Sequence, residues 1–192
     1  LDGVQNDIDI SMRQVLKTKE KTLIAEKCSQ HIQSGDSIFL DGSTTCWFVA
    51  RRLANKNLTV LTTSLQIATI LAASPTISLI LIGGAFSPKS MAFLGDNACR
   101  ALSNYYVDKA FISCRSVSME NGLTDVSEGE AAIHRLITQR SNRTYLVVDH
   151  SKVGPTSFAF ACGLDSIDAM ICDKPLPQEW QDYLSGKNIA FY

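Results

Sequence analysis

Short apolar runs alternate along the chain with segments in which apolar residues recur at three- and four-residue steps. The apolar runs predict buried strands at residues 37–40, 58–62, 77–82, 109–114, 144–148, 167–172 and 189–191. The helical spacing predicts helices at residues 19–34, 45–53, 66–73, 97–105, 128–140 and 178–186. Continuous apolar runs are typical of parallel strands that are buried on both faces. The pattern therefore predicts an α/β fold, a Rossmann-like and mostly parallel sheet with helices on both faces.

The start of the chain differs from this pattern. Residues 1–14 are polar and show no clean period, so we expect residues 1–18 to form a linker or an extended arm. Residues 19–192 have the length of one α/β domain. The chain begins at Leu1 without an initiating Met, and we expect a further domain to precede it.

Composition and charge exclude several classes of function. The 18 basic and 19 acidic residues leave a net charge of −1, so we expect this part of the protein not to bind DNA unaided. The six cysteines are scattered without a CxxC pair, which is typical of buried thiols in a reducing cytosol. The three histidines are far apart in sequence, so neither a metal site nor a cofactor is expected. No apolar run reaches membrane-spanning length, and no membrane partner is expected.

A loop rich in hydroxyl groups directly follows the first predicted strand. It consists of Asp41, Gly42, Ser43, Thr44 and Thr45, and it leads straight into a helix. Ligands in parallel α/β sheets bind at the carboxyl ends of the strands, and amides at a helix N-terminus attract anions. The loop is therefore a candidate phosphate site. A plain helix cap, in which Ser43 or Thr44 only satisfies backbone amides, is the alternative.

Polar and glycine residues recur near the ends of the later strands. They are Thr63, Ser64, Gly83, Gly84, Asp108, Arg115, Gly122, Thr124, Asp125, Glu128, Glu130 and Lys152. Lys152 follows a strand and can complete an anion site as a point charge. Each residue also has an ordinary interpretation: hydroxyls and Asn-Gly pairs form turns, glutamates in a first helical turn complement the helix dipole, and lysines are often solvated. The repetition at successive strand ends favours a binding site.

Six stretches, taken together and in order, resemble the C-terminal sensor domain of DeoR-type repressors. They are Ile38-Phe-Leu-Asp-Gly-Ser-Thr-Thr45, Leu58-Thr-Val-Leu-Thr-Thr-Ser-Leu65, Ile80-Leu-Ile-Gly-Gly84, Asp108-Lys-Ala-Phe111, Gly122-Leu-Thr-Asp125 and Asp149-His-Ser-Lys152. The resemblance implies a fold similar to ribose-5-phosphate isomerase. It also implies a phosphorylated sugar as effector, and a preceding winged helix-turn-helix that binds operator DNA.

The resemblance also implies roles for single residues. Residues 41–45 and Lys152 would hold the phosphate. The remaining candidates would contact the sugar: Thr63, Ser64, Gly83, Gly84, Asp108, Gly122, Thr124, Asp125, Glu128 and Glu130. The chain departs from the family at residues 113–118, where Ser-Cys-Arg-Ser-Val-Ser replaces a glycine-rich turn. Arg115 in this segment can add a charge to the pocket or pair with an acid at the surface.

Two alternatives to a sensor remain. A sugar-phosphate isomerase needs a carboxylate base, for which Asp108 and Glu130 are candidates. However, the isomerases carry a second Asp where this chain has Phe111, and their run of glycines is absent, so we expect no catalysis. Pure oligomerisation without a ligand would leave the strand-end hydroxyls unexplained.

We also expect a homo-oligomer, because apolar residues exceed the needs of one sheet. Those residues are Met91, Phe93, Leu94, Tyr105, Tyr106, Phe158 and Phe160. The first three follow Gly84 and Ser87-Pro88, where a loop or hairpin should project from the sheet edge.

Overall fold

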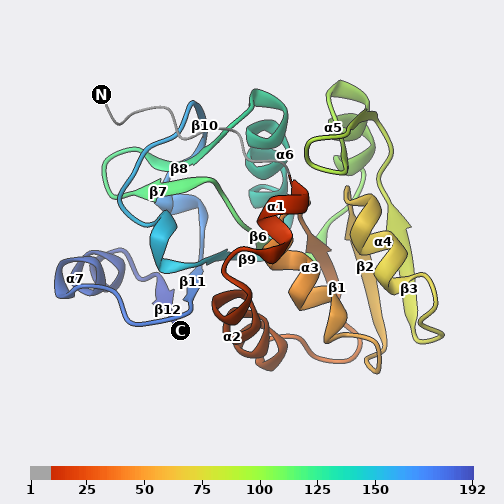
Figure 1. Ribbon diagram of the computed structural model, residues 1–192, viewed down its shortest axis with the longest axis horizontal. Helices are drawn as coiled ribbons and strands as arrows, with labels where there is room; N and C mark the ends of the chain where they lie inside the picture. Colours follow the sequence, from red (N-terminus) through yellow and green to blue (C-terminus); the bar gives the residue numbers. More distant parts are fainter. Residues whose placement is uncertain (1–9) are drawn as a thin grey trace.

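A seven-stranded sheet forms the centre of the molecule, in a computed structural model that describes residues 10–192 (Figure 1). Its strand order is β12-β11-β9-β6-β1-β2-β3, and every neighbouring pair is parallel. The strands are β1 (Ser37–Leu40), β2 (Leu58–Thr62), β3 (Ile77–Leu81), β6 (Val107–Ile112), β9 (Ser141–Val148), β11 (Ala169–Cys172) and β12 (Ala190–Phe191). The predicted mostly parallel sheet is confirmed.

Seven α-helices are present in the described part of the chain. They are α1 (Ile10–Val15), α2 (Thr18–Gln30), α3 (Thr44–Arg51), α4 (Leu65–Leu71), α5 (Asp96–Leu102), α6 (Glu128–Thr138) and α7 (Gln178–Gly186). Two single-turn 3₁₀ helices, η1 (His150–Lys152) and η2 (Leu164–Ser166), follow β9 and β10.

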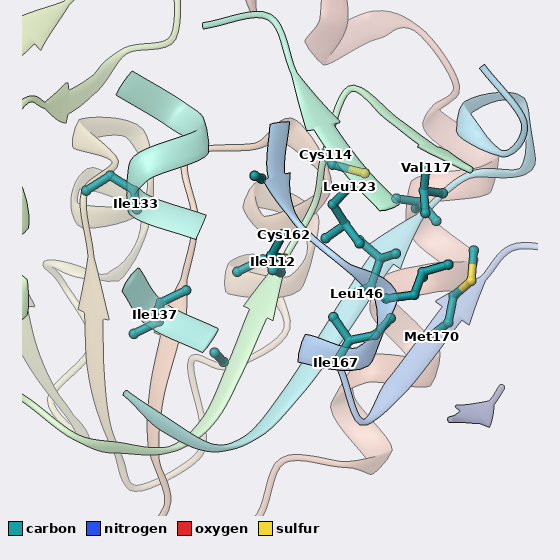
Figure 2. Close-up of a cluster of buried hydrophobic side chains, with 14 of the residues drawn as sticks. Ile112, Cys114, Val117, Leu123, Ile133, Ile137, Leu146, Cys162, Ile167 and Met170 are labelled. Atoms are coloured by element: carbon teal, nitrogen blue, oxygen red, sulfur yellow. The ribbon is translucent and has the colours of Figure 1, made fainter. Parts of the chain in front are cut away.

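The core has two parts, one on each face of the sheet, because successive side chains of a strand point to opposite faces. In β1, Ile38 and Leu40 pack with residues of α2, α3 and α4, whereas Phe39 packs with residues of α5 and α6. Figure 2 shows part of the cluster on the Phe39 side of the sheet. Leu146 of β9 lies there among other side chains of the sheet, and Ile133 and Ile137 extend from α6. Helices therefore cover both faces, as the apolar runs predict.

Two smaller β-structures flank the central sheet. One is the antiparallel sheet β10-β8-β7, formed by β7 (Ser116–Ser118), β8 (Gly122–Asp125) and β10 (Ala159–Cys162). The sequence pattern did not predict these short strands. Gly122 explains the tight turn between β7 and β8, since its φ of +63° lies in the left-handed region and a Cβ there would lie 2.4 Å from the Cys162 carbonyl oxygen. The other is the hairpin of β4 (Ala85–Ser87) and β5 (Ala92–Leu94), where the sequence predicts a loop or a hairpin.

The segment predicted to be an arm is partly helical. Of residues 1–18, expected to form a linker or an extended arm, residues 1–9 lie outside the described residues and residues 10–15 form the short helix α1. Ile10 is only 3% exposed and packs against the α2–α3 side of the core. Lys21 also holds this segment, since its Nζ donates to the carbonyl oxygen of Leu16 at 2.7 Å and to that of Arg13. A single buried apolar residue gives no period, which is why the sequence pattern missed α1.

The cysteines are all free thiols, and Cys99 alone is half-buried while the other five are buried. In residues 10–192, no helix is long and apolar enough to cross a membrane. The same residues bring no group of three or more His, Cys, Asp or Glu side chains together in a way that could hold a metal ion.

Candidate functional site

A cavity of about 280 Å³ lies at the carboxyl ends of β1, β2 and β6. It is closed from other sides by α1, by the hairpin β4–β5, by the start of α6 and by η1. Many polar side chains line it, among them Arg13, Lys21, Thr44, Ser90, Ser113, Asp125, Glu130, His134 and Lys152. Strand ends in a parallel α/β sheet are where small ligands bind, so this cavity is the candidate site.

The loop after β1 is shaped by Asp41 and Ser43. Asp41 Oδ1 accepts a hydrogen bond from the Ser43 amide at 2.9 Å, and Ser43 Oγ caps α3 by accepting from the Cys46 amide at 3.1 Å. Gly42 fits a tight space, since a Cβ there would lie 3.1 Å from the Ala92 side chain. Thr44, at the first turn of α3, lines the cavity. The cap interpretation of Ser43 is therefore correct, and the N-terminus of α3 still faces the cavity.

A buried histidine joins two carboxylates at the cavity wall. His134 of α6 contacts Asp125 Oδ2 through Nδ1 at 2.7 Å and Asp41 Oδ2 through Nε2 at 3.0 Å. Burial alone would lower the pKa of His134, but the two carboxylates raise it well above 6.5, so His134 is an imidazolium. Burial would likewise raise the pKa of Asp41, whereas the hydrogen bonds from His134, Ser43 and Ser113 lower it to about 2. The cluster is thus an ionised triad.

The triad ties together the loops that form the cavity. Asp41 Oδ2 also accepts from the Ser113 amide at 2.6 Å, after β6. Asp125 Oδ1 accepts from the Arg115 amide at 3.2 Å, and Asp125 itself ends β8. Both carboxylates therefore have protein donors for each oxygen. Asp41 orients the loop after β1 and the loop after β6, and its carboxylate is held by protein donors.

Cationic side chains also gather in the cavity. Lys152 Nζ donates to Ser113 Oγ at 2.9 Å. Lys21 is 4% exposed, and burial, followed by repulsion from Lys152 with a further contribution from Arg13, lowers its pKa from 10.5 to about 8. Like charges that lower a neighbour's pKa in this way favour the binding of an anion among them. The surroundings of Lys21 and Lys152 therefore suit a phosphoryl group.

Acidic groups lie beside the triad. Glu130 is in the first turn of α6, where its amide donates to Ser127 Oγ at 3.2 Å. Burial, followed by the charge of Asp125, raises the pKa of Glu130. Carboxylate oxygens accept hydrogen bonds from hydroxyl groups, so this region suits a polyol. The cavity thus offers cationic groups and acidic groups to one small ligand.

The structure brings together nine of the residues that the sequence predicts for the site. Those that line the cavity are Asp41, Gly42, Ser43, Thr44, Thr63, Arg115, Asp125, Glu130 and Lys152. Others belong to different surroundings: Ser64 caps α4, and Glu128 is exposed beside Arg135. Thr45 is buried in α3, and Gly84 packs closely against Ala98.

Three further predicted residues lie away from the cavity. Gly122 and Thr124 belong to the small antiparallel sheet and border a separate surface hollow. Gly83 also does not line the cavity. Gly122 and Thr124 precede Asp125 in β8, and only this last residue of the strand lines the cavity.

Asp108 corrects the sequence interpretation most clearly. It accepts hydrogen bonds from the Ser37 amide at 2.8 Å and from the Ser37 hydroxyl at 2.7 Å. Ser37 begins β1, and Asp108 is the second residue of β6, so this contact lies at the amino ends of the strands. The cavity is at the opposite edge of the sheet, and Asp108 cannot contact a ligand there.

Several residues that line the cavity were not predicted from the sequence. They are Arg13, Leu16, Lys17, Lys21, Ser90, Ala92, Leu94, Ser113, Cys114, Val126, Ile133, His134, Asp149 and Ser151. His134 had one usable signal, since it follows Glu130 by four residues and so shares its face of α6. Arg13, Lys17 and Lys21 lay in or beside a segment that the sequence assigned to an arm.

An α/β domain with a cavity at its strand ends, into which charged and hydroxyl side chains project, is typical of a domain that binds a small ligand. The chain belongs to the family of DeoR C-terminal sensor domains, whose sequence profile matches residues 16–174. The resemblance found in the sequence is confirmed.

Named relatives agree with this family, and a solved structure shares the fold. The HTH-type transcriptional regulator YulB of Bacillus subtilis is 36% identical over 185 residues, which are 96% of this chain and 72% of that protein. The glycerol-3-phosphate regulon repressor of Escherichia coli is 28% identical over 178 residues, or 92% of this chain and 71% of that protein. Ribose 5-phosphate isomerase A of Methanocaldococcus jannaschii matches with a TM-score of 0.51 at 19% identity, covering 70% of this chain and 53% of that structure. The chain spans about half the length of that isomerase, and the likeness confirms the predicted fold.

Proposed function

We propose that this domain binds a small phosphorylated sugar or polyol as an effector and thereby controls DNA binding by a helix-turn-helix domain of the same protein. The observation that carries the proposal is the cavity itself, which Lys21 and Lys152 line together with the acidic Asp125 and Glu130. Two relatives are named as transcriptional regulators, and one of these is named for the glycerol-3-phosphate regulon. Such a regulator would act in the cytoplasm, where its DNA is.

The phosphoryl group would lie between the N-terminus of α3 and the cations. Helix N-termini and lysine ammonium groups both favour a dianion. Gly42 would let the phosphoryl group approach the backbone closely, and Thr44 would provide a hydroxyl group. Lys152 is held at the cavity by Ser113. Glu130 and Asp125 would then face the hydroxyl groups of the effector. A sugar without a phosphoryl group would form only the contacts with Glu130 and Asp125.

Thermal unfolding with matched ligand pairs tests this function. Ribose 5-phosphate and glycerol 3-phosphate should raise the melting temperature, whereas ribose and glycerol at equal concentration should not. A ligand at about 100 times its Kd adds about 2.7 kcal/mol to the free energy of unfolding. Equal shifts for phosphorylated and free compounds, across a panel of sugar phosphates, would remove the phosphate site from the proposal.

The same samples distinguish a sensor from an isomerase. Asp41 and Asp125 are held by His134 and by backbone amides, and Asp108 is at the far edge of the sheet. Glu130 remains as a candidate base, but isomerisation also requires groups that stabilise an enediolate. We propose that the ligand leaves unchanged, and recovery of an isomerised sugar phosphate after incubation would favour the enzyme instead.

We also propose that the domain self-associates. Met91 and Leu94 fold back onto the core, but Phe158 is 88% exposed and Phe160 is 56% exposed beside a surface hollow of about 490 Å³. Exposed aromatic residues around a hollow are typical of protein interfaces, and a second copy would bring two DNA-binding domains together. Sedimentation equilibrium at micromolar concentration should show a dimer or larger assembly, and Phe158→Ser should weaken it. A wild-type monomer under these conditions would contradict the proposal.

A further inference from the structure

The short helix α1 forms part of the cavity wall. Figure 1 shows α1, in red, over the carboxyl ends of the central strands, and it contacts α3. Arg13 of α1, and Leu16 and Lys17 directly after it, line the cavity together with the loop after β1. The wall is therefore built partly by residues that precede the globular core.

Within residues 10–192, Ile10 and Lys21 make the main contacts that fix α1 in this position. It has six residues, too few to be stable as an isolated helix. Ile10 is its one buried residue, and the Lys21 ammonium group holds its carboxyl end through the carbonyls of Arg13 and Leu16. Lys17, which joins α1 to α2, has a φ of +56°, a left-handed conformation that is unfavourable for a lysine. The docked position of α1 therefore depends strongly on what its side chains meet in the cavity.

Arg13 has unused capacity to bind an anion. Its Nε is buried and has no hydrogen-bond partner among residues 10–192. A buried N–H group without a partner is costly, and an acceptor that reaches it removes that cost. The charges of Arg13 and Lys152 both lower the pKa of Lys21, so these three cations lie close enough to repel one another. A phosphoryl group would accept from Arg13 and offset the repulsion among the three.

We propose that Arg13 binds the phosphoryl group of the effector, and that an occupied cavity holds α1 in its docked position. This proposal rests on the proposed function and deepens it, because it assigns both a ligand residue and a route of regulation. The effector would then act on the chain that precedes the domain by fixing the helix at its entrance. By linkage, whatever stabilises the docked helix also tightens effector binding to the same degree.

Calorimetric titration of the full 192-residue chain with ribose 5-phosphate and with inorganic phosphate tests the contact. Arg13→Met, which keeps the aliphatic stem, should weaken both Kd values at least tenfold, and Arg13→Lys should recover part of the loss. Met12→Ala is the matched control, since Met12 lies on the same helix, is 55% exposed and does not line the cavity. It should bind both ligands within about twofold of the wild type, as expected for an exposed substitution.

Hydrogen exchange of the α1 amides tests the coupling. Saturating ribose 5-phosphate should slow exchange in residues 10–16 of the wild type, and Arg13→Met should lose this protection even at saturating ligand. Circular dichroism would verify that the variant is folded.

Each outcome decides between the two proposals. Wild-type affinity in Arg13→Met, or ligand protection of α1 that persists in it, overturns the role of Arg13 and leaves the proposed function intact. Binding of inorganic phosphate that depends on Arg13, without binding of any sugar phosphate, supports the Arg13 contact and overturns the proposed effector. A wild-type chain that binds neither compound overturns both.

Discussion

Replacement of His134 with leucine is expected to lower the free energy of unfolding by about 3–5 kcal/mol at neutral pH, the usual cost of removing one partner from a buried ion pair. The imidazolium is 7% exposed and lies within 3.0 Å of both Asp41 and Asp125. Without it, two buried carboxylates would repel each other across the space that it leaves. The loops after β1, β6 and β8 would also lose their common support. Chemical denaturation measures the change.

The pH dependence of this loss identifies its cause. The pKa of His134 is raised in the folded state, so its stabilisation is complete below pH 6.5 and is lost as the pH rises through the folded pKa. The leucine side chain cannot titrate, and without the histidine burial would raise the pKa of Asp41. The variant should therefore gain stability as the pH falls and Asp41 becomes protonated, and the two proteins should converge in acid.

A second histidine provides the control. His31 packs against the rings of Tyr145 and Tyr192 and forms no ion pair in the described part of the chain. Burial lowers the pKa of His31, so its titration affects stability only below pH 6.5, and His31→Leu should leave the pH profile above pH 6.5 unchanged. A loss below about 1 kcal/mol in His134→Leu, with a wild-type pH profile, would show that the triad does not hold the loops together.

The sheet was predictable because burial on both faces leaves a direct pattern. Residues 38–40 of β1 and 145–148 of β9 are apolar at consecutive positions, and that is what a strand between two helical layers requires. The loop after β1 was also predictable, since a ligand loop must follow a strand at its carboxyl end. Asp108 was assigned to the sugar by the resemblance, but β6 begins at Val107, so Asp108 lies at the amino end of its strand.

Other site residues depend on contacts that no local pattern encodes. His134 is 93 residues from Asp41, and only the folded chain brings them together. Arg13 reaches the cavity because Ile10 and Lys21 dock α1, and a six-residue helix leaves almost no periodic signal. The triad also changes the meaning of Asp41, a residue whose place in the loop suggested direct contact with phosphate.

Replacement of Lys152 with methionine should weaken the binding of a phosphorylated effector by about 10- to 100-fold. Lys152 lines the cavity half-buried, and its Nζ is directed by Ser113 Oγ at 2.9 Å. A hydrogen bond to a charged group contributes about 1.5–3 kcal/mol, and each 1.4 kcal/mol is a factor of about ten in Kd. Methionine keeps most of the length of the stem and removes the ammonium group. Affinity for the free sugar, which lacks the dianion, should stay the same.

The same substitution, Lys152→Met, should leave the stability of the ligand-free protein unchanged or raise it slightly. Lys152 is a leading cause, after burial, of the lowered pKa of Lys21, so its removal relieves repulsion and should raise the pKa of Lys21 from about 8. Weaker effector binding together with unchanged or slightly greater stability would therefore separate a ligand contact from a structural one. Lys174→Met serves as the control, because Lys174 is exposed and does not line the cavity. If Lys152→Met and Lys174→Met bind ribose 5-phosphate as the wild type does, the phosphoryl group does not contact Lys152, and the effector must occupy the cavity in another orientation.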